Sequence, residues 1–125
     1  MILLVDDEPE ILDIYKTELE GAGYQVITAA NGAEGLNCAR KNRPDLVLMD
    51  FKMPVMDGIE AFTALKEDAK TKDIKVVFVS AFGDSNITDR DIKTAREIGA
   101  LDFIKKGIDL AEFVAKVKSY IDAAA

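Results

Sequence analysis

Short apolar runs alternate along the chain with longer segments whose apolar residues recur every three or four positions. The apolar runs predict β-strands at residues 1–5, 25–29, 45–49, 74–79 and 101–104. Three of these runs are continuous stretches of Val, Ile, Leu or Phe without polar alternation. Such runs are typical of parallel strands that are covered on both faces.

Each predicted strand is followed by a segment with one apolar face, which indicates an amphipathic helix. The last segment has the clearest stripe, formed by Leu110, Phe113, Val114, Val117 and Ile121. Five strands alternating with five helices predict an α/β domain, a doubly wound parallel sheet with right-handed crossovers. Ligands of such sheets bind beyond the carboxyl ends of the strands, so residues at those ends are the candidates for function.

Length and composition narrow the possible functions. The 125 residues fit one domain spanning 1–125, and the net charge of −7 argues against a nucleic-acid-binding surface. No stretch approaches the roughly 20 apolar residues of a membrane span, and we expect no membrane partner.

The acidic first residues indicate no export signal. The single Cys38 excludes an internal disulfide, is expected to pack as a small apolar residue, and favours a cytoplasmic location.

The chain contains no histidine, which removes the commonest general base and metal ligand. It also contains no CxxC pair, no GxGxxG motif and no phosphate loop of the form GxxxxGKS or GxxxxGKT. Any chemistry must therefore be carried by carboxylates, hydroxyls and lysines.

Three carboxylates follow the strands that are expected to be neighbours in the sheet. Asp6 and Asp7 end the first strand, and Asp50 ends the third. Two carboxylates at about 4 Å repel by roughly 4 kcal/mol at an effective dielectric constant near 20. A cluster of three therefore requires a cation or a proton. Because carboxylate oxygens suit Mg²⁺, we expect these acids to form a magnesium site with an open side.

Helix capping accounts for other acidic residues. Asp7 can cap the first helix, with Pro9 in its first turn and Glu10 three residues on, in a pattern resembling a capping box. Glu8 and Glu10 then favour the helix dipole and are interpreted as structural. Asp57 is expected to cap the third helix.

Asp50 has further polar residues at the same edge of the predicted sheet. The fourth strand ends at Ser80, and the fifth ends in a pair of lysines, Lys105 and Lys106. A carboxylate, a hydroxyl and an ammonium around a divalent cation form a site for a phosphoryl group, in which the carboxylate attacks phosphorus. In a chain without histidine, Asp50 is the candidate nucleophile.

The sequence resembles the receiver domains of response regulators over essentially its whole length. "VDDEPEI", "DLVLMDFKMPVMDG", "VVFVSA" and "GALDFIKK" occur in the order and at the spacing of that family. The resemblance implies a flavodoxin-like strand order, 2-1-3-4-5, and a two-component protein that receives a phosphoryl group from a histidine kinase or a histidine phosphotransfer protein. It also implies that Asp50 is the phosphoacceptor and that Asp6, Asp7, Asp50 and the Lys52 backbone carbonyl hold Mg²⁺.

The resemblance assigns further roles by matched position. Ser80 and Lys106 would bind the phosphoryl group, and Ser80 and Phe103 would form a switch, with fixed core as the alternative for Phe103. Lys52 and Ala81 would flank an attacking water molecule and tune dephosphorylation. The fourth helix, fifth strand and fifth helix would form the face that contacts a downstream protein target or effector domain.

Two features depart from the family pattern. Counting from Gly99 matches Lys106, rather than Lys105, to the family's lysine, and Gly107 then replaces a proline. Without proline a cis peptide would cost roughly 2.5–4 kcal/mol, so we expect a trans bond here. The segment 80–99 is also longer than usual, and either a tolerated surface insertion or a functional one fits it.

Other classes of protein remain as alternatives. Gly107 supports a receiver-like interaction module that works without phosphorylation. An aspartyl-nucleophile Mg²⁺ phosphatase would need a second Asp at Lys52, and a flavodoxin-like cofactor carrier would need a phosphate loop after the first strand. The favoured receiver would dephosphorylate itself slowly and would not be an enzyme with turnover.

Overall fold

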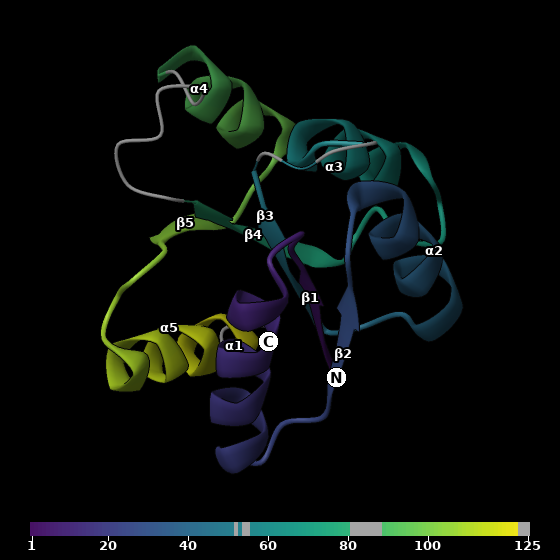
Figure 1. The fold of residues 1–125 in the computed structure, drawn as a ribbon. Helices are drawn as coiled ribbons and strands as arrows, with labels where there is room; N and C mark the ends of the chain where they lie inside the picture. Colours follow the sequence, from purple (N-terminus) through teal and green to yellow (C-terminus); the bar gives the residue numbers. More distant parts are fainter. Residues whose placement is uncertain (52, 54–55, 81–88, 123–125) are drawn as a thin grey trace.

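The computed structural model describes residues 1–51, 53, 56–80 and 89–122, in which strands and helices alternate (Figure 1). The strands are β1 (Ile2–Val5), β2 (Val26–Ala29), β3 (Leu46–Asp50), β4 (Lys75–Ser80) and β5 (Asp102–Lys105). The helices are α1 (Pro9–Gly21), α2 (Gly32–Asn42), α3 (Gly58–Glu67), α4 (Asp89–Ile98) and α5 (Leu110–Asp122). All strand pairs are parallel, in the order β2-β1-β3-β4-β5, which confirms the predicted fold class.

Helices cover both faces of the sheet. Helices α1 and α5 lie on one face, and α2, α3 and α4 lie on the other (Figure 1). Successive residues of β1 belong to different cores: Leu3 and Val5 pack toward α2 and α3, whereas Ile2 and Leu4 pack toward α1 and α5. Burial on both faces explains the continuous apolar runs. No helix in the described part of the chain is long and apolar enough to cross a membrane.

Three strands extend one residue beyond the predicted apolar runs, so that Asp50, Ser80 and Lys105 are the last residues of their strands. The reason is that strand ends depend on backbone pairing, which a polar side chain does not interrupt. Asp50 pairs with Val79, and Ser80 pairs with Lys105. Asp50 and Ser80 are therefore held by the sheet itself.

The predicted cap at Asp7 is wrong. Helix α1 begins at Pro9 with Glu8 at the N-cap position, and no side chain caps it. The N–H of Glu8 donates instead to Oδ1 of Asp6 at 2.9 Å. Because the helix begins at Pro9, the N-cap position falls on Glu8 and not on Asp7, whose side chain is exposed.

The predicted cap at Asp57 is confirmed, and it brings α3 against Asp50. Asp57 Oδ1 accepts a hydrogen bond from the N–H of Glu60 at 2.9 Å. The next residue, Gly58, donates its N–H to the Phe51 carbonyl at 3.0 Å. A Cβ on Gly58 would lie 2.3 Å from the Asp50 carbonyl oxygen, so only glycine permits this approach.

We predict that Gly58→Ala lowers the free energy of unfolding by roughly 1–3 kcal/mol, because the added methyl group forces α3 away from the backbone of Asp50. Chemical denaturation measures this change. Gly21→Ala is the matched control, since no atom lies within 4 Å of the added carbon. The control should be neutral or stabilise by up to about 1 kcal/mol. Equal effects of the two substitutions would contradict the close approach.

Candidate functional site

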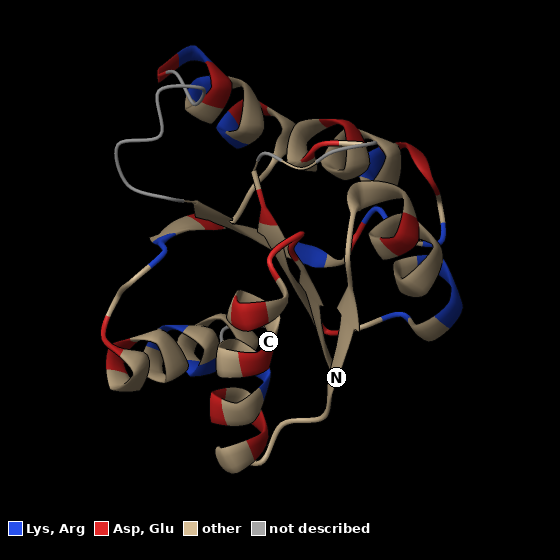
Figure 2. Cartoon of the chain, in the orientation of Figure 1, with Lys and Arg blue, Asp and Glu red and all other residues tan. Residues whose placement is uncertain are grey.

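Acidic side chains gather where β1 and β3 end. One carboxylate oxygen from each of Asp6, Asp7, Glu8 and Asp50 lies within 4.8 Å of the others. Figure 2 shows the acidic colour on the segment that follows β1 and at the end of β3. Asp6 and Asp50 are 4% and 6% exposed, whereas Asp7 and Glu8 are exposed. The three acids expected from the sequence do come together, and Glu8 joins them.

The ammonium group of Lys106 lies among these carboxylates. Its Nζ is 3.0 Å from Asp6 Oδ2, 2.9 Å from Glu8 Oε1 and 3.3 Å from Asp50 Oδ2. The backbone N–H of Lys106 donates to the Ser80 carbonyl at 2.7 Å and so fixes the chain just beyond β5. This placement agrees with the spacing argument that favours Lys106 at the site.

The pKa of Asp50 is raised to about 7, first by burial and then by the neighbouring charge of Asp6, while Lys106 acts to lower it. Burial also raises the pKa of Asp6, although hydrogen bonds from the Glu8 amide and from Lys106 oppose the change. Burial would lower the pKa of Lys106, but its bonds to Glu8 and Asp6 and the charge of Asp50 raise it. One ammonium therefore does not compensate both buried carboxylates.

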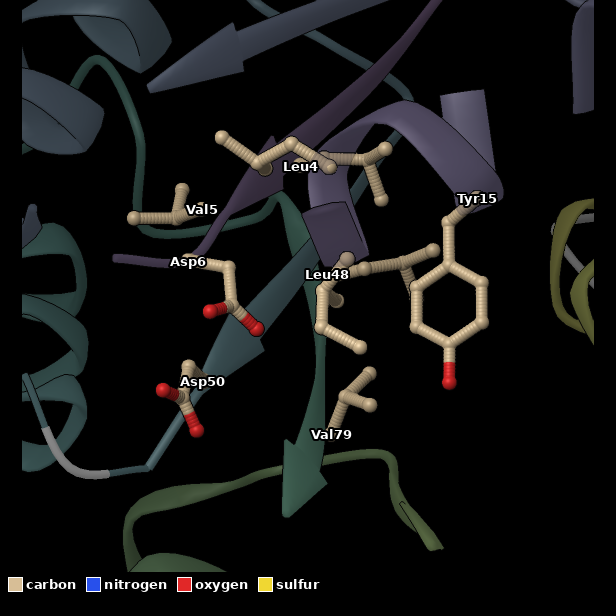
Figure 3. A pocket seen from close by; sticks show the side chains of 9 residues that line it. Leu4, Val5, Asp6, Tyr15, Leu48, Asp50 and Val79 are labelled. Carbon is tan, nitrogen blue, oxygen red and sulfur yellow. The ribbon is translucent and has the colours of Figure 1, made fainter. Parts of the chain in front are cut away.

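A small pocket lies between β1, β3 and α1, and its lining includes both buried acids (Figure 3). Figure 3 shows the carboxylates of Asp6 and Asp50 close together, with the Tyr15 ring beyond Leu48. The pocket has a volume of only about 10 Å³, and apart from the two acids and Tyr15 its lining is aliphatic. It has room for about one water molecule. A larger ligand would therefore meet the carboxylates from the open edge of the sheet.

The expected switch residues lie on β4, which is paired with β3, and on β5 at the edge of the sheet. Ser80 is partly buried and follows Val79, the register partner of Asp50. The Phe103 ring stacks on Phe78, with a centroid distance of 5.6 Å, and lies 6.1 Å from the ring of Phe51.

Lys52 and Ala81, which the sequence assigns to metal binding and to dephosphorylation, lie outside the described residues. Their predicted roles remain predictions.

Gly107 has a conformation that proline cannot adopt. Its φ is +86°, whereas the proline ring fixes φ near −65°. The described peptide bonds include no cis bond, so the expected trans bond is confirmed. Burial raises the pKa of Tyr15, and a hydrogen bond with the Gly107 backbone opposes that rise. Proline has no N–H with which to make such a contact.

The contact between Glu8 and Lys106 was missed by sequence reasoning, which assigned Glu8 to the helix dipole. The two residues are 98 positions apart. They follow strands β1 and β5, which are separated in the sheet by β3 and β4. No local sequence pattern indicates this pair. The available signal was indirect: a lysine expected beside Asp6 could also bind the other acidic residues close to Asp6 in the sequence.

Comparison with known proteins agrees with this geometry. The model of the response regulator receiver domain matches residues 2–118. The chain belongs to the response-regulator receiver family. As a receiver domain, it is similar to the Sporulation initiation phosphotransferase F of Bacillus subtilis, with 38% identity over 96% of this chain and 92% of that protein.

Longer proteins and solved structures also match this receiver domain. The Transcriptional regulatory protein PrrA of Mycobacterium tuberculosis is 40% identical over 96% of this chain, which spans only 49% of that protein's length. A solved CheY-like response regulator receiver domain protein from Methanospirillum hungatei superposes with a TM-score of 0.88 at 30% identity. That match covers 98% of this chain and 93% of the other.

We predict that the metal-free receiver domain loses stability as the pH rises from about 4 to about 7. The folded Asp50 has a pKa of about 7, above the value of about 3.9 for an unfolded Asp. The folded state therefore binds more protons in this interval, and stability falls as they dissociate. Asp50→Asn should make the decline shallower, by on the order of a few kcal/mol over the interval.

Urea denaturation in a chelating buffer between pH 4 and pH 8 measures these slopes. Asp13→Asn, on the exposed side of α1, removes one carboxylate without touching the cluster and serves as the control. If stability declines with the same slope in the wild type and in Asp50→Asn, the pKa of Asp50 is not raised in the folded protein.

Proposed function

We propose that Asp50 accepts a phosphoryl group from the phosphohistidine of a histidine kinase or a histidine phosphotransfer protein. One observation carries the proposal: the buried Asp50 carboxylate lies 3.3 Å from a lysine ammonium, inside a cluster of carboxylates. Membership of the receiver family supports the class of reaction. Receiver domains interact with histidine kinases or phosphotransfer proteins, which would be the phosphoryl donor, and with downstream effectors, which would be the partner.

The donor set fits Mg²⁺. Asp6, Asp7 and Asp50 offer only oxygen atoms, which are the ligands that Mg²⁺ prefers together with water and phosphate. The raised pKa of Asp50 means that added positive charge would stabilise the site. We propose that these three acids hold the ion, and the Lys52 carbonyl is a further predicted ligand. When bound, Mg²⁺ supplies positive charge that offsets the charge on the transferring phosphoryl oxygens.

Asp50 is the nucleophile in the proposed transfer. A carboxylate oxygen of Asp50 forms a bond to phosphorus as the bond between phosphorus and the donor imidazole nitrogen breaks. That nitrogen keeps the electron pair of the broken bond. Lys106 can bond an oxygen of the phosphoryl group, since its Nζ already lies against Asp50. Only the ionised form of Asp50 attacks, so the reaction requires the proton to be absent.

The proposed switch links the phosphoryl group to a partner surface. The Ser80 hydroxyl would move toward the phosphoryl group, and Phe103 would rotate into the space that it leaves. Two contacts support this coupling: the Lys106 amide bonds the Ser80 carbonyl, and Phe103 stacks on Phe78 of β4. The partner surface would be α4, β5 and α5; Figure 1 shows β5 between the two helices on the same side of the view.

A receiver-like module that works without phosphorylation is the alternative, and Gly107 is its main support in the sequence. The position of Lys106 favours the phosphoacceptor, because its ammonium reaches Asp6 and Asp50 although no proline follows it. The acyl phosphate would hydrolyse slowly, so we propose a single-use acceptor and not an enzyme with turnover.

We predict that acetyl phosphate with Mg²⁺ converts the protein to a base-labile, acid-stable phosphoryl adduct. Mass spectrometry detects the adduct, which Asp50→Asn should lack. Asp6→Asn should require a roughly tenfold or more higher Mg²⁺ concentration for the same rate, because it loses a ligand of the ion. Asp13→Asn should behave as the wild type, since its side chain is exposed on α1 away from the cluster.

An undiminished adduct in Asp50→Asn would rule out Asp50 as the acceptor. Absence of any adduct in the wild type would support the phosphorylation-independent module. Repeated turnover of a phosphomonoester would support a phosphatase.

We also predict that Ser80→Ala accepts the phosphoryl group in similar yield but loses the response of α4, β5 and α5, because the hydroxyl that moves is missing. Backbone amide NMR before and after phosphorylation measures this response. Ser119→Ala is the control, since its hydroxyl bonds the Lys116 carbonyl at an exposed position of α5. Unchanged shifts of those elements in Ser80→Ala would argue against the switch.

A further inference from the structure

Lys106 has three carboxylate partners, and one of them differs in exposure. The side chains of Asp6 and Asp50 are 6% and 8% exposed, whereas that of Glu8 is 58% exposed. Glu8 occupies the N-cap position of α1, but its side chain makes no capping hydrogen bond. The role of its carboxylate in the described structure is therefore the pair with Lys106, at 2.9 Å.

The ammonium has no donor left for a further acceptor. A lysine side chain offers three N–H donors, and Nζ of Lys106 already lies within 3.3 Å of three carboxylates. A phosphoryl oxygen on Asp50 could take the donor that now faces Asp50, but the ammonium can offer it a second donor only by giving up Asp6 or Glu8. Leaving a buried carboxylate such as Asp6 unpaired is costly. An exposed carboxylate is solvated by water instead, so Glu8 is the partner released at the lowest cost.

We propose that Glu8 is a positioning residue, which holds the Lys106 ammonium in the unphosphorylated protein and competes with the phosphoryl group for it. This inference rests on the proposed phosphorylation of Asp50. Its direction follows from two effects of the same sign. Glu8 occupies a second donor of Lys106 and draws the ammonium away from the phosphoryl group. Its carboxylate also lies within 4.8 Å of that of Asp50, where it repels an added anion.

The test uses the beryllium fluoride complex, which binds an aspartate carboxylate as a non-covalent analogue of the phosphoryl group. Calorimetric titration at saturating Mg²⁺ gives its dissociation constant. Glu8→Gln should lower this constant roughly two- to fivefold, the range expected for loss of an exposed ion pair. Glu10→Gln is the matched control: it removes the same charge from the first turn of α1 and should leave the constant unchanged.

A double-mutant cycle separates competition for Lys106 from simple repulsion. In a Lys106→Met background no ammonium remains to be shared, so Glu8→Gln should improve binding less than it does in the wild type. An equal improvement in both backgrounds would overturn the proposal, because repulsion alone would explain it. No change, or weaker binding in Glu8→Gln, would overturn it as well.

A second measurement needs no phosphoryl analogue. In the metal-free protein, the ¹⁵N-labelled ammonium signal of Lys106 should shift or broaden in Glu8→Gln and stay unchanged in Glu10→Gln. An unaffected signal in Glu8→Gln would overturn the positioning role. If the wild type and every variant fail to bind beryllium fluoride, the proposed function fails together with this inference. If beryllium fluoride binds normally and its dissociation constant is the same in Glu8→Gln as in the wild type, only this inference is overturned.

Discussion

Two buried carboxylates sharing one ammonium are the interaction on which the whole site depends. Asp6 and Asp50 are both nearly inaccessible to solvent, and Lys106 lies within 3.3 Å of each. Their charges exceed that of the lysine, which is why the pKa of Asp50 rises to about 7. The folded protein therefore carries an unfavourable charge balance at the end of its sheet. A bound cation would relieve this imbalance, which supports the proposed magnesium site, and a buried, poorly solvated carboxylate suits the proposed attack on phosphorus.

The sheet makes this crowding possible. Asp50 and Ser80 are the last residues of their strands, so backbone pairing fixes both positions before any side chain contributes. Gly58 then lets α3 approach the Asp50 carbonyl, and the Lys106 amide is tied to the Ser80 carbonyl. Rigid elements thus hold the acids together against their mutual repulsion, which flexible loops would relieve by moving apart.

The sequence predicts the features of the fold and of the site that depend on apolar periodicity and on the positions of the strand ends. The apolar runs specify the strands, and the position of a residue at a strand end places Asp6, Asp50 and Lys106 at one edge. Contacts that depend on the side-chain geometry of neighbouring residues or on strand order are not predictable in this way. Helix α1 begins at Pro9, so Glu8 and not Asp7 takes the N-cap position, and the cap expected from Asp7 does not form. Glu8 meets Lys106 only because the fold brings the ends of β1 and β5 to the same edge.

A chain of aromatic contacts extends from the residue after Asp50 to the exposed Arg96. Phe51 directly follows Asp50, and its ring lies 5.0 Å from that of Phe78, which stacks on Phe103. The guanidinium of Arg96, on α4, lies 5.1 Å from the centre of the Phe103 ring. Closely packed rings shift between discrete arrangements and do not deform gradually. The proposed rotation of Phe103 would therefore break the contact with Arg96. Through this contact, the position of α4 would depend on whether Asp50 is phosphorylated.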